Sequence, residues 1–89
     1  MDADMKEIIK TTEGKWSNYS DNKWNGSDRK LSDGRTLRLA REGGDGEPVD
    51  LFKFNKTMML EWRISFSSET PATVVAAALN ESVRIGGKG

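Results

Sequence analysis

The clearest hydrophobic pattern lies in the C-terminal third of the chain. Over Leu60–Phe66 apolar and polar side chains alternate, which is typical of a strand with one face on a core and the other in water. Over Val75–Val83 apolar residues recur at helical spacing with alanines between them, which indicates a slim amphipathic helix. Thr70 and Pro71 are residue types favoured at a helix start, and a later Gly-Gly pair favours its end. The pattern predicts a strand, a tight corner and a helix over residues 70–83.

The preceding part of the chain predicts antiparallel sheet. A Ser-Asp-Gly turn is followed by an alternating run at residues 35–41, and a further apolar segment covers Val49–Phe54. The apolar positions of this second segment change phase halfway, which indicates a bulge or a strand covered on both faces. Asn25 and Gly26 form a turn dipeptide, so a first strand and a hairpin-like excursion are expected around them. We predict a sheet of three to four antiparallel strands over residues 15–66.

The two ends complete an α+β domain. Residues 1–13 begin with acids, carry Ile8 and Ile9 at helical spacing from Met5, and predict a short N-terminal helix. Residues 84–89 are expected to form a flexible tail. The chain is therefore predicted to be a single small domain over residues 1–89, in which the C-terminal helix packs across the sheet.

The composition narrows the chemistry. The chain has no cysteine and no histidine, so disulfides, zinc sites and histidine-activated nucleophiles are not expected. The glycine-rich acidic segment at residues 42–48 has neither the Lys-Ser/Thr pair of a phosphate-binding loop nor the desolvated carboxyl pair of an acid–base site. Its Asp45 and Glu47, with Asp50 nearby, would hold a cation only weakly. We therefore expect no enzyme, no cofactor and no metal site.

Location and assembly follow from the same composition. No apolar run is long enough for a membrane span, and acids stand near the N-terminus where a signal peptide would carry Lys or Arg. We therefore expect a cytoplasmic protein without a membrane partner. Apolar residues make up 35% of the chain and charged residues 31%, so the core is thin. A homodimer is one way to cover the remaining apolar surface.

One segment mixes aromatic and basic side chains, and it supplies most of the candidate site. Together with one arginine from a later strand, the candidate residues are Lys15, Trp16, Tyr19, Lys23, Trp24, Arg29, Lys30 and Arg38. Rings placed among cations can stack nucleic-acid bases while the cations follow the phosphates. The same residues can instead form a protein-contact surface, or the two tryptophans can simply cap a thin core. The net charge of zero, and the aspartates within the segment, weigh against a strong attraction to nucleic acid.

Several short motifs follow one another in the C-terminal half. They are a Ser-Asp-Gly-Arg turn, a tryptophan-containing strand, Phe-Ser, Thr-Pro-Ala and an aliphatic–alanine helix, found at residues 32–35, Trp62, 66–67, 70–72 and 74–77. Over residues 31–80 this arrangement resembles an actinobacterial domain family of unknown function, abundant in streptomycetes. The chain departs from the family because no proline lies between Ser32 and Asp33, and because its N-terminal third does not match. The resemblance implies the order of strands and helix and an actinobacterial or phage origin, but no activity.

These features predict a non-catalytic binding module, an actinobacterial or phage accessory protein that acts through protein–protein contact. The alternative is a single-stranded nucleic-acid-binding protein that uses the aromatic and basic set. The two differ in their response to salt, because phosphate-driven binding weakens steeply as salt rises and an apolar protein interface changes little.

Overall fold

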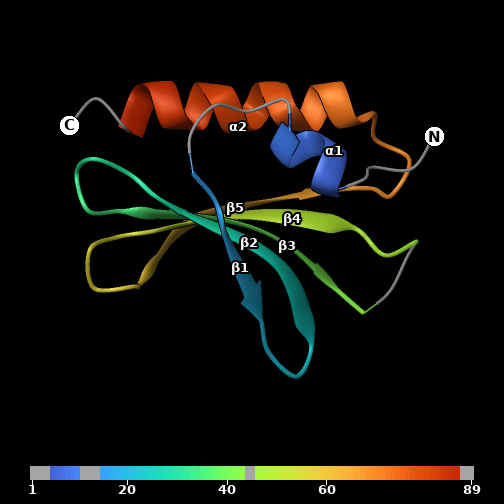
Figure 1. Ribbon diagram of the computed structural model, residues 1–89, viewed down its shortest axis with the longest axis horizontal. Coiled ribbons are helices and arrows are strands. Elements are labelled where there is room, and N and C mark those ends of the chain that lie inside the picture. The colour runs from blue at the N-terminus through green and yellow to red at the C-terminus, as the bar shows by residue number, and fades with distance from the viewer. Residues whose placement is uncertain (1–4, 11–14, 44–45, 87–89) are drawn as a thin grey trace.

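The computed structural model describes residues 5–10, 15–43 and 46–86, and it places two helices on one side of a single sheet (Figure 1). The protein is therefore an α+β domain, as the sequence predicts. The elements in chain order are α1 (Met5–Lys10), β1 (Ser17–Ser20), β2 (Trp24–Lys30), β3 (Thr36–Glu42), β4 (Val49–Phe54), β5 (Leu60–Phe66) and α2 (Ala72–Gly86).

The sheet is an antiparallel meander in which the strands lie in the order β1-β2-β3-β4-β5. Each strand pairs with its neighbours in the sequence. The sheet has five strands, so the prediction of three to four was wrong. The count was too low because β1 and β2 contain almost no aliphatic residues, and their polar side chains give no apolar alternation that would mark a strand.

The hairpin that joins β1 and β2 turns at Asp21 and not at the Asn-Gly pair that the sequence suggested. The Asp21 carboxylate accepts hydrogen bonds from the backbone N–H groups of Lys23 at 2.8 Å and Trp24 at 2.7 Å, which closes the turn. The Asn-Gly pair lies inside β2. Gly26 is required there because a Cβ atom on it would lie 2.0 Å from the Leu39 carbonyl oxygen of β3.

The hydrophobic core lies between the sheet and the helices, a region that we call the helical side. Its fully buried side chains come from both helices and the two central strands, and are Ile8, Leu37, Leu39, Val49, Leu51, Val75 and Leu79. The helical spacing predicted for α2 is confirmed in its buried face, with Val75 and Leu79 at the centre and Val83 at the margin of the core. Ile8 anchors α1, which packs against α2. The short helix is therefore part of the domain body.

The strand β4 carries apolar side chains on both faces, which explains the phase change in its sequence. Val49 and Leu51 are fully buried on the helical side, whereas Phe52 and Phe54 lie on the other face of the sheet. The register with β5 also shifts between Lys53 and Phe54, as in a β-bulge. The structure thus contains the bulge, whereas the second face of β4 is apolar but is not covered by either described helix.

The helix α2 begins at Ala72, two residues later than predicted, and ends later than predicted. Its first hydrogen bonds run from the N–H groups of Val74 and Val75 to the Pro71 carbonyl, at 3.0 and 3.3 Å. At the other end the helix continues through Gly86, so the first part of the predicted tail is helical. An ion pair between Arg84 and Glu81 supports this last turn. The rest of the predicted tail, and the predicted N-terminal helix outside α1, lie outside the described residues.

Replacing Gly26 by alanine is expected to lower the free energy of unfolding by about 1–3 kcal/mol, because the new methyl group would collide with the β3 backbone. Urea unfolding followed by circular dichroism measures the change. Asn25→Ala is the matched control, since Asn25 is exposed in the same strand, and it should alter stability by less than about 0.5 kcal/mol. Equal stabilities of the two variants would contradict the close approach of β2 and β3.

Candidate functional site

The face of the sheet opposite the helices carries a connected group of aromatic rings. Trp24 of β2 meets Phe52 of β4 edge to face with ring centroids 5.4 Å apart, and Phe52 stacks on Phe54 with centroids 5.9 Å apart. Tyr19 of β1 is half-buried, like these three rings. Together with the two arginines that touch them, these rings form what we call the aromatic face, made of Tyr19, Trp24, Arg38, Phe52, Phe54 and Arg63.

The guanidinium groups of the two arginines lie over the rings. The guanidinium carbon of Arg38 is 3.6 Å from the ring centroid of Tyr19 and 4.9 Å from that of Phe54. The guanidinium carbon of Arg63 is 5.4 Å from the centroid of Phe52. Contacts of this kind contribute about 0.5–1 kcal/mol each at exposed sites. They favour one placement of each long arginine side chain over the rings.

Each arginine is also paired with a carboxylate from a neighbouring strand. Arg38 donates two hydrogen bonds to Asp28, at 2.7 and 3.0 Å, and this pairing raises the pKa of Arg38 above its ordinary value. Arg63 lies 2.9 Å from the buried Asp50, which also accepts a hydrogen bond from the Ser65 hydroxyl at 2.6 Å. Positive charge on the aromatic face is therefore offset by negative charge on the adjacent strands.

A tyrosine–aspartate pair lies where β1 meets the turn. The Tyr19 hydroxyl donates a hydrogen bond to the Asp21 carboxylate. This bond raises the pKa of Tyr19, because it stabilises the neutral phenol, and the nearby Arg38 opposes the rise. The same bond lowers the pKa of Asp21, with help from the backbone N–H groups that close the turn. The residue that shapes the hairpin thus also fixes one ring of the aromatic face.

The aromatic face is hollowed into a depression of about 300 Å³, lined by Tyr19, Asp21, Trp24, Arg38, Phe52, Phe54 and Arg63. Its walls are rings and guanidinium planes from all strands of the sheet. The volume is at the small end of the range for ligand pockets. It suits one large side chain or one planar group, with the rest of a partner lying on the surrounding sheet.

The structure separates the candidate residues that the sequence grouped. Trp16 packs against the core, and Arg29 is in register with Leu37, so both belong to the helical side. The part of the set found on the aromatic face is Tyr19, Trp24 and Arg38. The exposed cations around the β1–β2 hairpin are Lys15, Lys23 and Lys30.

Half of the aromatic face was missed from the sequence. Phe52, Phe54 and Arg63 come from β4 and β5, more than twenty residues beyond the end of the segment that looked unusual. Their signal was present in the phase change of β4, because a strand with apolar residues on both faces has to place one apolar set away from the core. Because the described helices cover only one side of the sheet, the second apolar set, Phe52 and Phe54, lies at the surface.

The chain matches no family model, no curated protein and no solved structure. The resemblance to the actinobacterial family stays a prediction. No helix in the described part of the chain is long and apolar enough to cross a membrane. Among residues 5–10, 15–43 and 46–86, acidic side chains do not gather in a group of three that could hold a metal ion, and Asp45 of the acidic segment lies outside these ranges.

The phenol of Tyr19 is expected to titrate above the ordinary tyrosine pKa of about 10. Tyr19 is the single tyrosine of the chain, so the ultraviolet absorbance of the phenolate reports on it alone. The urea-unfolded chain supplies the reference pKa. Asp21→Asn removes the negative charge, keeps an oxygen for the turn, and should move the pKa of Tyr19 back toward the reference. An unshifted pKa in the folded wild-type protein would contradict the hydrogen bond.

Proposed function

We propose that this protein is a non-catalytic binding module that contacts another polypeptide through its aromatic face. One observation carries the proposal. Three half-buried rings joined by direct contacts, and Tyr19 joined to them through Arg38, lie on the sheet face opposite the two described helices. Each arginine among them is already paired with a carboxylate. The surface is thus apolar and aromatic at its centre and close to electrically neutral.

The residue types of this face are those that dominate protein interfaces. Tyrosine, tryptophan, phenylalanine and arginine are enriched at such contacts, and a small central group of them usually carries most of the binding energy. Cation–π contacts and ion pairs already restrict Arg38 and Arg63, so less side-chain entropy is lost on binding. The depression among the rings offers a place for one anchoring side chain of the partner.

The biological setting that we propose rests on the sequence resemblance. It favours an accessory protein of an actinobacterium or its phages. The cytoplasmic location that we propose rests instead on the composition of the chain, which has no apolar run long enough for a membrane span. A homodimer remains compatible with binding through the aromatic face, since the edges of the sheet are separate surfaces.

Single-stranded nucleic acid is the second candidate partner. Rings and arginines lie together on one side of an antiparallel sheet, which is a layout that can stack bases and follow phosphates. The carboxylates of Asp28 and Asp50 oppose it, because a phosphate would have to compete with them for the guanidinium groups of Arg38 and Arg63. We therefore rank a polypeptide partner first.

Photo-crosslinking tests the proposed surface directly. A benzophenone amino acid placed at Phe54, in cells that naturally produce the chain, is expected to yield a crosslink to a defined protein. The same probe at Thr73, an exposed position of α2, is the matched control and should not yield it. Phe52→Ser should weaken binding of that protein by about tenfold or more, because Phe52 contacts both neighbouring rings.

Circular dichroism serves as the folding control for Phe52→Ser, whose side chain lies outside the buried core. Crosslinks that form equally from Thr73, or a folded Phe52→Ser protein that binds as tightly as the wild type, would contradict the proposed surface.

A fluorescence titration with a short single-stranded oligonucleotide tests the second candidate. Trp16 and Trp62 pack against the core and Trp24 lies on the aromatic face, so base stacking would quench Trp24. We expect a flat titration at both about 50 mM and about 200 mM salt. Quenching that fades with salt, and that disappears in Trp24→Phe, would instead identify nucleic acid as the partner.

A further inference from the structure

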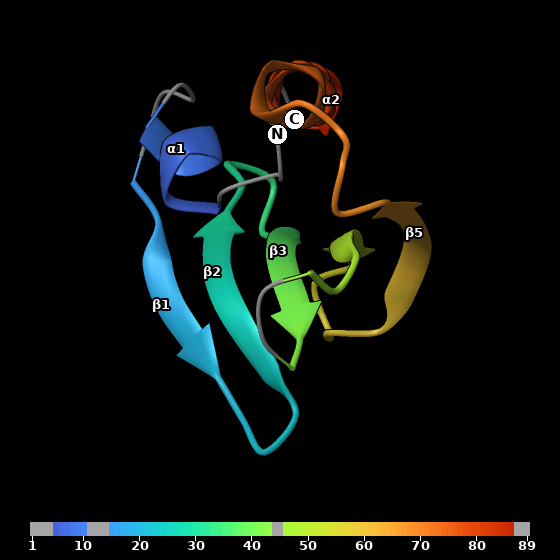
Figure 2. The same ribbon diagram turned by 90° about the vertical axis from the view of Figure 1, so that its right-hand side faces the viewer.

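The strand β5 forms one edge of the sheet, and it differs from the opposite edge. In Figure 2 β5 lies at the margin of the sheet, and α2 runs above the sheet without covering that edge. The other edge strand, β1, has four residues, Ser-Asn-Tyr-Ser, whereas β5 has seven and is largely exposed. A long edge strand without lysine or proline is a template for pairing with another strand.

Exposed apolar side chains gather along this edge. In the described part of the chain, the large apolar residues that are exposed in or just before β5 are Met58, Met59, Leu60 and Ile64, with exposures of 48%, 65%, 53% and 42%. Trp62 and Phe66 flank Ile64 on the same face of β5 and are only partly buried against the core. The hydrophobic core thus extends to the β5 edge, where the side chain of Ile64 is exposed to solvent.

We propose that β5 pairs antiparallel with β5 of a second copy of this chain, about a twofold axis at Ile64. The segment Trp62–Phe66 reads aromatic, aliphatic, aromatic on one face in either direction. In this register Ile64 meets its own copy and Trp62 meets Phe66 of the partner. Arg63 meets the partner's Ser65 on the other face. Apolar and aromatic cross-strand pairs of this kind stabilise a sheet.

Registers with the axis nearer the start of β5 are less favourable. A twofold axis at Arg63 would place two arginines directly opposite each other, which is destabilising. An axis at Trp62 would carry the ladder across Glu61, the residue that the register shift between β4 and β5 leaves unpaired. The regular half of β5, Trp62–Phe66, is therefore the half that can extend the sheet. Its self-complementary pattern selects a second copy over an unrelated strand.

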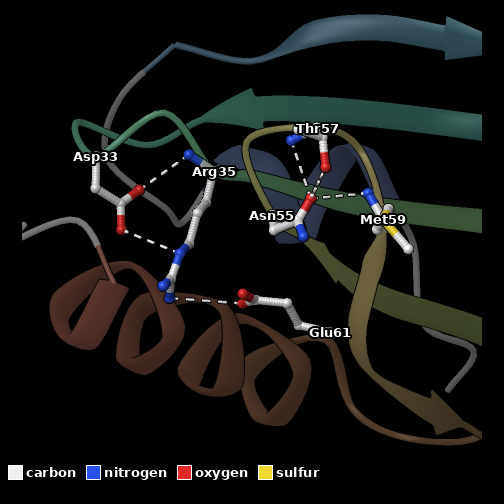
Figure 3. Close-up of polar contacts among 6 residues, drawn as sticks. All are labelled: Asp33, Arg35, Asn55, Thr57, Met59 and Glu61. Carbon is white, nitrogen blue, oxygen red and sulfur yellow. Dashed lines mark hydrogen bonds and ion pairs between the residues drawn. The ribbon is translucent and has the colours of Figure 1, made fainter.

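The start of β5 is fixed by contacts that keep the irregular half in place (Figure 3). The Asn55 side chain accepts hydrogen bonds from the backbone N–H groups of Thr57 and Met59, each at 2.9 Å, and Met58 has a positive φ of 65°. Glu61 lies 3.5 Å from Arg35, which is itself 3.6 Å from Asp33. The register shift before Trp62 is thus stabilised by the Asn55 turn and by the ion pairs that join Asp33, Arg35 and Glu61. We expect this register shift to persist in the dimer.

The arrangement of the two chains in the proposed dimer follows from its twofold symmetry. A twofold axis through an antiparallel strand pair stands perpendicular to the sheet, so both helical layers lie on one side of the combined sheet. The two aromatic faces then lie side by side on the other side, unobstructed by the interface. A ladder of five residues is short, so we expect a weak dimer, in the range of the smaller transient interfaces.

The test is sedimentation of the full chain over a range of concentrations, with two charge variants at the symmetry centre. Ile64→Lys and Ile64→Glu each place like-charged side chains directly opposite each other across the axis, with Cβ atoms about 5 Å apart, and each should weaken dimerisation at least about tenfold. An equal mixture of the two variants places opposite charges there and should restore dimers. Since Ile64 is 42% exposed in the single chain, both variants should remain folded, which circular dichroism verifies.

Asn18→Lys is the matched control, because Asn18 is an exposed residue of the opposite edge strand, and it should leave the dimer unchanged. Three results would overturn the proposal: a wild-type protein that stays monomeric up to about 1 mM, a mixture of the two Ile64 variants that stays monomeric, or a dimer that Asn18→Lys dissociates. None of these results bears on the aromatic face, whose partner is tested separately.

Discussion

One layer of helix has to cover a sheet that is wider than the layer, and much of the structure follows from this constraint. A helix is about 10 Å across and strands are spaced about 4.8 Å apart, so α2 can seal only the middle of the sheet. Val75 and Leu79 accordingly bury the leucines of β3 and β4, and α1 adds Ile8 beside them. The far face of the sheet and its β5 edge are left to other means of stabilisation.

On the aromatic face, which lies opposite the helices, neighbouring side chains stabilise one another by direct contact. Phe52 touches the rings on either side of it, and Arg38 covers two rings while its charge is taken up by Asp28. This arrangement resembles a thin second core that is open to solvent, and it is mixed in polarity because water reaches it. A surface built in this way is rigid and nearly neutral, which suits a partner with its own apolar groups better than a polyanion.

The sequence revealed those parts of the structure in which apolar periodicity decides the outcome. The helix α2 and strands β3 and β5 were predicted because their apolar residues repeat with the period of the element, although Leu60 and Ile64 of β5 are exposed and not packed in the core as the alternation indicated. For β1 and β2 the sequence indicated only a first strand and a hairpin-like excursion around Asn25 and Gly26. The regular second strand and the turn at Asp21 were missed, because a polar hairpin is stabilised by main-chain pairing, by the Asp21 turn and by the close approach at Gly26, which leave little trace in hydropathy. Of the eight candidate residues, Tyr19, Trp24 and Arg38 lie on the aromatic face, whereas Phe52, Phe54 and Arg63 of β4 and β5 become their neighbours only through pairing across the sheet.

The neighbour-to-neighbour order of the strands also bears on how the chain folds. Every strand pair closes a short stretch of chain, so the sheet can grow as a series of hairpins with little loss of loop entropy at each step. The contact between α1 and α2 is different, since it joins the first and last elements across roughly sixty residues. We expect the sheet and α2 to assemble first and α1 to dock late. A folding transition state that is organised around the central hairpins, with the N-terminal helix still free, is the kinetic signature of this topology.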